Sequence, residues 1–150
     1  MSKLKYEKYF IKDTGFTAPP PGERPFGKFQ VPKLHHILSI SRRRIDEAIT
    51  MNCSWMLAGE DAGKMDRHTH PYPEIIGFVG TNPANLNDLG AEAEMWMDDE
   101  QYILTKSFMV YIPSGLKHCP LTVRNIKRPV FHFDLQITTG DFKSEFSTDD

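Results

Sequence analysis

The chain has 150 residues, with 18 lysines and arginines against 20 aspartates and glutamates and a formal net charge of −2. A chain of this length forms one domain with its own hydrophobic core. The near balance of charge and the lack of a basic run argue against nucleic acid as a partner. The two cysteines, Cys53 and Cys119, are too few for a disulfide framework, so a reducing compartment is expected.

Residues 1–32 are expected to form an extended arm. The start of the chain has no apolar stretch typical of a signal peptide, and no run is long enough to span a membrane, which predicts a cytoplasmic protein without a membrane partner. The proline-rich segment 18–27 can form neither a helix nor a central strand. A disordered tail rarely carries many aromatic residues. Four phenylalanines nevertheless lie in or beside this segment, which predicts that the arm packs on its own barrel or on a neighbouring subunit: Phe10, Phe16, Phe26 and Phe29.

Residues 33–140 are expected to form the folded domain, from roughly nine short strands separated by turn-rich segments. The alternation is clearest in 91–97, where alanines and methionines share one face and two glutamates lie on the other. Short strands at regular spacing predict an all-β sandwich or barrel. The last residues, 141–150, are polar and are expected to fray. The expected strands are 34–40, 49–57, 68–70, 74–79, 91–97, 102–105, 107–112, 121–124 and 130–137.

The segment 68–74, with the sequence HTHPYPE, is the most informative one in the chain. Side chains alternate along a strand, so His68 and His70 point to the same face. The two prolines that follow interrupt the strand, because proline has no N–H to donate and a fixed φ. The chain must turn there, and Glu74 begins the next extended stretch. A carboxylate is therefore brought back beside two imidazoles.

A second segment, 113–118, adds a third imidazole. Its sequence PSGLKH begins with a turn-forming run at the end of an expected strand, so His118 arrives from a different strand. Three imidazoles and one carboxylate are ligands suited to iron, manganese, cobalt, nickel, copper or zinc. The two segments together predict a site for one divalent transition metal ion.

These two segments resemble the two motifs of the cupin superfamily, HxHxxxE and PxGxxH. The resemblance covers about residues 63–134 and implies a single-domain cupin-type jelly-roll β-barrel, commonly a homodimer. It also implies that the metal is held at the matched positions, which are His68, His70, Glu74 and His118. The chain departs from the family pattern at glycine positions and at Thr122, but at none of these ligands.

Two residues are candidates for moving a proton. His132 alternates with two phenylalanines on the last expected strand. If its face looks into the barrel, it is a candidate general acid or base, and if it looks outward, it is a solvated histidine. Tyr72 lies in the turn between two candidate ligands, where it either donates a proton or hydrogen bond or packs at the rim.

Three further residues are candidates for contacting a small molecule. Ile76 and Phe78 share the face of Glu74 and are expected to form an apolar wall. Of the adjacent pair His35 and His36, only one can point inward, and His36 shares a face with apolar neighbours. A pocket with such walls suits a small oxygenated organic molecule with a hydrophobic or aromatic part.

Two functions from different classes fit these observations. The first is a metalloenzyme acting on a small oxygenated or carboxylated compound, by decarboxylase, isomerase or lyase chemistry or by oxidation with dioxygen. An open position beside four protein ligands favours this first function, because it marks catalytic rather than structural metal sites. The alternative is a metal-containing ligand-binding or sensor cupin without turnover. A fold alone does not decide between them.

Overall fold

The computed structural model describes residues 4–15, 34–60, 63–140 and 145–146. The proline-rich segment 18–27, for which an extended and packed arm was predicted, lies outside these residues. Residues 4–15 include one short 3-10 helix, η1 (Glu7–Tyr9), rather than an entirely extended chain. Within the described ranges no helix has the length and apolar character needed to cross a membrane.

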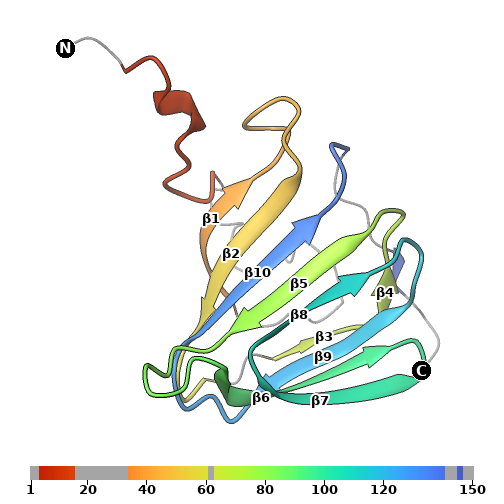
Figure 1. Ribbon diagram of the computed structural model, residues 1–150. Coiled ribbons are helices and arrows are strands. Elements are labelled where there is room, and N and C mark those ends of the chain that lie inside the picture. Colours follow the sequence, from red (N-terminus) through yellow and green to blue (C-terminus); the bar gives the residue numbers. More distant parts are fainter. Residues whose placement is uncertain (1–3, 16–33, 61–62, 141–144, 147–150) are drawn as a thin grey trace.

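The domain is built from two antiparallel sheets that face each other (Figure 1). The first sheet has five strands, and its spatial order alternates between early and late parts of the chain. In this order β10 is the central strand, paired with β2 on one side and β5 on the other. In order across the sheet, the strands are β1 (His35–Ile40), β2 (Thr50–Met56), β10 (Val130–Gln136), β5 (Glu74–Val79) and β8 (Phe108–Ile112).

The second sheet has six strands, some of them only two residues long. Its longest strand, β6, pairs with β7 on one side and with β9 on the other. In order across the sheet, the strands are β11 (Glu145–Phe146), β4 (His68–Thr69), β9 (His118–Arg124), β6 (Asp88–Met97) and β7 (Glu100–Lys106), and β3 (Lys64–Met65) pairs with β9 outside this path. The predicted all-β class and jelly-roll type are confirmed.

The hydrophobic core lies between the two sheets, because one face of each strand carries the apolar residues. On β5, Ile76 and Phe78 are buried, whereas Val79 is exposed on the opposite side. On β6, the predicted alternation is confirmed by the burial of Ala93 and Met95. The core cluster consists of Met56, Ile76, Phe78, Leu89, Ala93, Met95, Ile112, Cys119, Leu121, Val123, Ile126 and Val130.

The structure differs from the sequence-based expectations mainly in its shortest strands. β3 was not predicted, and β4 ends at Thr69, so His70 follows the strand rather than lying within it. In the tail that was expected to fray, β11 pairs with β4. Each of these pairings joins residues far apart in the sequence, and two-residue strands carry too few side chains to show a period.

Candidate metal centre

The backbone brings the two motifs together at one end of the barrel. His68 on β4 is the register partner of His118 on β9. The N–H of Gly115 donates to the carbonyl oxygen of His70 at 2.8 Å, which ties the two turns to each other. Glu74 is the first residue of β5, in the opposite sheet. The predicted turn after His70 therefore carries the chain from one sheet to the other.

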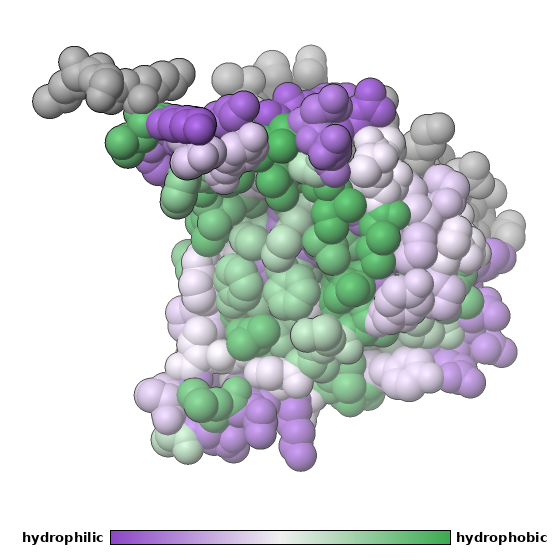
Figure 2. Space-filling view, turned by 45° about the horizontal axis from the view of Figure 1, so that its top comes forward, coloured by the Kyte–Doolittle hydropathy of each residue, from purple (hydrophilic) through white to green (hydrophobic). Residues whose placement is uncertain are grey.

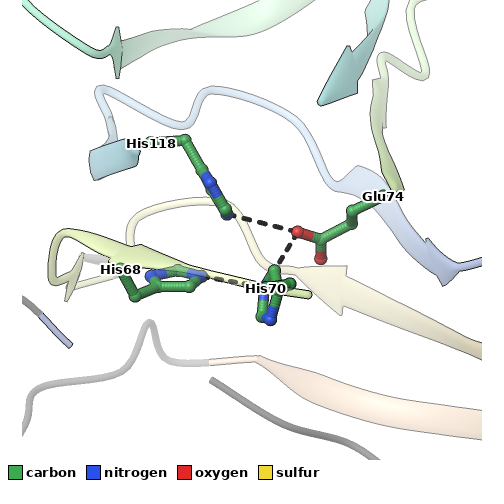
Figure 3. A group of neighbouring side chains, drawn as sticks. All are labelled: His68, His70, Glu74 and His118. Atoms are coloured by element: carbon green, nitrogen blue, oxygen red, sulfur yellow. Dashed lines mark hydrogen bonds and ion pairs between the residues drawn. The ribbon is translucent and has the colours of Figure 1, made fainter. Parts of the chain in front are cut away.

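The four predicted ligands converge on one point (Figure 3). His68 Nε2 lies 3.1 Å from His70 Nε2. Glu74 Oε2 lies 3.1 Å from His70 Nε2 and 3.3 Å from His118 Nε2. One ligand atom from each residue lies within 4.8 Å of the others, and all four side chains are buried. These distances are measured between candidate ligand atoms. Because the four atoms lie so close together, a single ion placed between them would be within reach of all four residues.

Backbone carbonyls orient two of the imidazoles. His68 Nδ1 donates to the carbonyl oxygen of Asp66 at 2.7 Å, and His118 Nδ1 donates to that of Leu116 at 2.9 Å. A proton held at Nδ1 leaves the lone pair of a neutral ring on Nε2, which faces the centre. Both rings are thus held in the tautomer that binds a metal ion.

The electrostatics favour the protonation states that bind a metal. Burial, and to a smaller extent the nearby ring of His118, lower the pKa of His68 to about 4. Burial alone would raise the pKa of the Glu74 carboxyl, but the imidazoles of His118 and His70 outweigh this and lower it to about 2. At neutral pH the site therefore contains an ionised carboxylate and at least one neutral imidazole, the forms required of ligands.

Two ligand atoms also lack the hydrogen bonds that buried polar atoms normally make. Among the described residues, Glu74 Oε2 and His118 Nε2 are buried without a hydrogen bond, although they lie 3.3 Å apart. An unsatisfied buried acceptor costs free energy, and native structures contain few of them. A cation between these atoms would satisfy both. The residues therefore fit a metal ion, and the coarse prediction of a buried metal site agrees with the structure.

A network of polar side chains behind Glu74 was missed by the sequence analysis. Gln136 Nε2 donates to Glu74 Oε1 at 3.2 Å and lies 3.5 Å from Asp134 Oδ1. Asn52 Nδ2 donates to the same Asp134 oxygen at 2.8 Å, and Ser39 Oγ donates to Asn52 Oδ1 at 2.5 Å. Alternation on the last strand already placed Asp134 on the face of His132, but nothing in the sequence indicated which face looks inward.

Tyr72 and Ile76 lie close to the four ligands. The Tyr72 ring stacks on that of His70, with centroids 5.3 Å apart and planes 11° from parallel. Ile76 is buried and is the register partner of Asp134. Tyr72 is therefore placed where it could hold a proton beside the site, and Ile76 is buried on the same face of β5 as Glu74, as an apolar wall would require. Their roles stay predictions.

His132, Phe78 and His36 lie further away, towards the other end of the barrel. His132 is buried on the inner face, stacks on Phe78 and donates from Nδ1 to the carbonyl oxygen of Gly77 at 3.0 Å. His132 pairs with Phe78 and not with Glu74, which pairs with Gln136, so the Cα atoms of His132 and Gln136 are four residues apart along the strand, or about 13 Å. The role of His132 as a general acid or base stays a prediction.

Phe78 and His36, the two other candidates for contacting a ligand, differ in their surroundings. Phe78 is fully buried within the core cluster, which favours a packing role. His36 Nδ1 lies 2.8 Å from Ser54 Oγ on the neighbouring strand, and burial lowers the pKa of its ring. Binding by either residue stays a prediction.

A cleft of about 670 Å³ opens between β7 and β8. Its walls are mostly apolar, with Leu104 and Phe108 on opposite sides, and the acidic turn Asp98–Glu100 lies at its rim. None of the four candidate ligands lines it, although Leu116, which accepts the hydrogen bond from His118, does. The cleft adjoins the metal centre without containing it.

Comparisons with known proteins identify the fold. No protein-family model and no curated protein matches the chain. An uncharacterised conserved protein with a double-stranded β-helix domain from Klebsiella pneumoniae has a similar structure, with 13% identity, a TM-score of 0.51 and coverage of 98% of both chains.

Two other solved structures are similar at lower TM-scores. A cupin-like protein from Thermotoga maritima shares 15% identity over 86% of this chain and 89% of its own, with a TM-score of 0.46. The DMSP lyase DddQ from Ruegeria pomeroyi shares 17% identity over 91% of this chain, with a TM-score of 0.48, and this chain spans only 61% of its length. The two facing antiparallel sheets and the full-length match to a double-stranded β-helix show that this chain has the cupin fold, with a buried group of three histidines and one glutamate that could hold a metal ion.

Proposed function

We propose that the protein is a metal-dependent enzyme that acts on a small oxygenated or carboxylated organic compound. The observation that carries the proposal is the convergence of His68, His70, Glu74 and His118 on one buried point. Four protein ligands on a six-coordinate metal leave positions for a substrate, which is the arrangement of catalytic sites. When bound, a divalent transition metal would polarise a substrate oxygen and stabilise negative charge that develops there.

The residues of the chain would contribute positioning and proton transfer. The backbone carbonyls that hold His68 and His118 keep the two rings aimed at the centre. Tyr72, stacked on His70, is the candidate for holding a proton near the substrate. The burial of the ligands would exclude bulk water from the site. The identity of the metal decides between non-redox chemistry and oxidation with dioxygen.

The test is metal analysis followed by turnover assays. We expect the purified, untagged protein to contain about one transition metal ion per chain, because the described residues form one four-ligand group. Chelation should abolish conversion of a compound found by screening small hydroxy, keto and phenolic acids. Protein without metal, even after anaerobic reconstitution, would contradict the proposal. Protein with one metal per chain that converts none of these compounds would favour the alternative, a ligand-binding or sensor cupin.

The outer face of the five-stranded sheet supports the proposal that the protein is a homodimer. Trp55 and Phe131 pack edge to face at 5.3 Å there, and the ring of Phe133 occupies the space that a Cβ on Gly77 would need. Met109 on the same face is 69% exposed. Figure 2 shows a broad hydrophobic area on one face of the molecule, surrounded by hydrophilic residues. Areas of this kind on soluble proteins often mark interfaces.

Light scattering after size exclusion tests the dimer. The expected result is about twice the chain mass of 17.2 kDa. Met109→Lys should weaken association, because burying an unpaired ammonium in an interface is costly. Lys106→Met on β7, which lies in the other sheet, serves as the control and should leave the mass unchanged. A monomer at all concentrations would contradict the proposal of a homodimer.

A further inference from the structure

The carboxylate of Glu74 is held from behind by the amide of Gln136. Gln136 is the last residue of β10 and the register partner of Glu74, the first residue of β5. Its Nε2 donates to Glu74 Oε1 at 3.2 Å. Just beyond this pair, the N–H of Ile137 donates to the carbonyl oxygen of Pro73 at 2.9 Å. The backbone hydrogen bonds therefore continue past Glu74 and Gln136 and keep the two residues opposite each other.

The two oxygens of the Glu74 carboxylate have different surroundings. Oε1 accepts the hydrogen bond from Gln136, whereas Oε2 lies 3.1 Å from His70 Nε2 and 3.3 Å from His118 Nε2 (Figure 3). Among the described residues, Oε2 is also one of the few buried polar atoms without a hydrogen bond. The donor on Oε1 thus restrains rotation of the carboxylate and leaves one oxygen directed at the histidines.

The neighbours of the Gln136 amide set its orientation. Besides Glu74, its Nε2 also approaches Asp134 Oδ1, at 3.5 Å. An amide has two N–H donors on its nitrogen and none on its oxygen, and an ionised carboxylate only accepts. The NH₂ group therefore faces both carboxylates, and the amide oxygen is turned away from them. The opposite orientation would bring acceptor atoms together without a proton between them.

This orientation has a cost that packing alone does not explain. Gln136 is 3% exposed, and its Oε1 is buried without a hydrogen bond from any described residue. An unsatisfied buried acceptor lowers stability, and an apolar side chain of similar size would avoid that loss. What an apolar side chain could not supply is the N–H that Glu74 Oε1 accepts. The contact with Glu74 therefore accounts for a glutamine at this position.

Building on the proposed function, we propose that Gln136 is a positioning residue of the metal centre. Its N–H holds Glu74 Oε1 away from the metal, so that the carboxylate offers Oε2 as its one ligand atom. A carboxylate that was free to turn could bind through both oxygens and would then occupy a position that a substrate needs. Gln136 thus fixes a ligand in advance, which raises the affinity for the metal, and keeps a coordination position open.

The test measures Co²⁺ binding by the whole chain after Gln136 has been replaced. Gln136→Met keeps the length of the side chain and removes the N–H donor. Its affinity for Co²⁺, measured by competition with a chelator at pH 7.5, should fall about 10- to 100-fold. The visible absorption spectrum of the bound Co²⁺ should change as well, because it depends on the number and arrangement of the ligands. Gln136→Leu also lacks the donor and takes the place of Gln136→Met if that variant does not fold.

Gln101→Met is the matched control, because it removes the same kind of contact from a different place. Gln101 Nε2 donates to Glu94 Oε1 at 2.9 Å, and both side chains lie at the surface of the other sheet. This variant should bind Co²⁺ with the affinity and the spectrum of the wild type. An equal loss of affinity in Gln101→Met would contradict the proposal.

A double substitution separates positioning of Glu74 from a general effect on the fold. Glu74→Ala keeps the three histidines and should still bind Co²⁺, more weakly than the wild type. Adding Gln136→Met to this protein should not weaken binding further, because no carboxylate is left to hold. The same loss with and without Glu74 would overturn the positioning role, since a distorted fold would act on the histidines too.

The remaining outcomes separate this inference from the function on which it rests. Wild-type affinity or an unchanged Co²⁺ spectrum in Gln136→Met would overturn the positioning role alone, provided that the wild type binds one Co²⁺ per chain. Wild-type protein that takes up no Co²⁺ would overturn both proposals.

Discussion

Replacing His70 by alanine is expected to abolish stoichiometric metal binding. His70 contributes one of four buried ligand atoms, and its Nε2 lies 3.1 Å from both His68 Nε2 and Glu74 Oε2. Its loss therefore removes a ligand that neighbours two others. The affinity should fall by more than the roughly 10- to 100-fold that follows removal of a group behind a ligand. Metal content per chain after dialysis measures the effect.

Thermal unfolding provides a second measurement on the same variants. A ligand that binds only the native state stabilises it by about 2.7 kcal/mol at 100 times its Kd. Added Zn²⁺ or Co²⁺ should therefore raise the Tm of the wild type and leave that of His70→Ala unchanged. His35→Ala is the matched control, because His35 is exposed and pairs with Glu60 instead. Wild-type metal content in His70→Ala would place the metal at another site.

Replacing Asp134 by asparagine is expected to stabilise the metal-free protein at neutral pH. Burial raises the pKa of Asp134 from its ordinary 3.8 to about 6. At 1.36 kcal/mol per pKa unit, this shift sets an upper limit of about 3 kcal/mol on the penalty for ionising the group, and solvent screening at this half-buried side chain reduces it. Asparagine has the same shape and keeps an oxygen to accept from Asn52, but carries no charge. The gain in free energy of unfolding should therefore be about 1–3 kcal/mol at pH 7.5.

The gain in free energy of unfolding of Asp134→Asn should disappear at low pH. This pH dependence would show that the gain comes from removing the charge of the Asp134 carboxylate. Between about pH 4 and pH 6 the native state keeps the proton on Asp134 longer than the unfolded state does, so the contribution of this group to stability falls as the pH rises through that window. Below pH 4 the protonated acid and asparagine are nearly equivalent. Glu74, with a pKa lowered to about 2, has the opposite dependence, but it is present in both variants and cancels in their difference.

Urea denaturation of both proteins at pH 4 and pH 7.5 measures the two free energies. Asp99→Asn, which changes an exposed carboxyl, should show no comparable difference between the two pH values. If Asp134→Asn were less stable than the wild type at pH 7.5, the carboxylate would have a stabilising partner, and the expected gain in stability would be wrong.

The candidate metal ligands could be predicted from the sequence because local rules place them. Proline at positions 71 and 73 forces the chain to turn between His70 and Glu74, and the turn before His118 ends β8. The strands of the barrel could be predicted for a similar reason, since a period of two is visible wherever a strand is several residues long, as in β6. The resemblance to the cupin motifs then predicted how these pieces assemble, and the structure confirms that fold.

The sequence alone could not show which of His132 and Asp134 lies nearer the metal ligands. Both share one face of β10, and alternation assigns two faces to a strand without saying which one is buried. Only the pairing of β10 with β2 and β5 turns that face inward. Only the register shows that Asp134 lies two residues, and His132 four residues, from Gln136, the partner of Glu74. The sequence favoured His132 as the polar partner of the metal site, whereas the register brings Asp134 and Gln136 closer.

The sequence by itself therefore determined the class of the fold, the turns and the four residues that could bind a metal, because the pattern within each segment is local and the resemblance to the cupin motifs joined the two segments. The tertiary structure decided the short strands β3, β4 and β11, the inner and outer faces of the sheets, and the polar line from Glu74 to Ser39. The physical reason is that strand pairing joins residues tens of positions apart. Its register is set by burial of one whole face, which no local pattern contains.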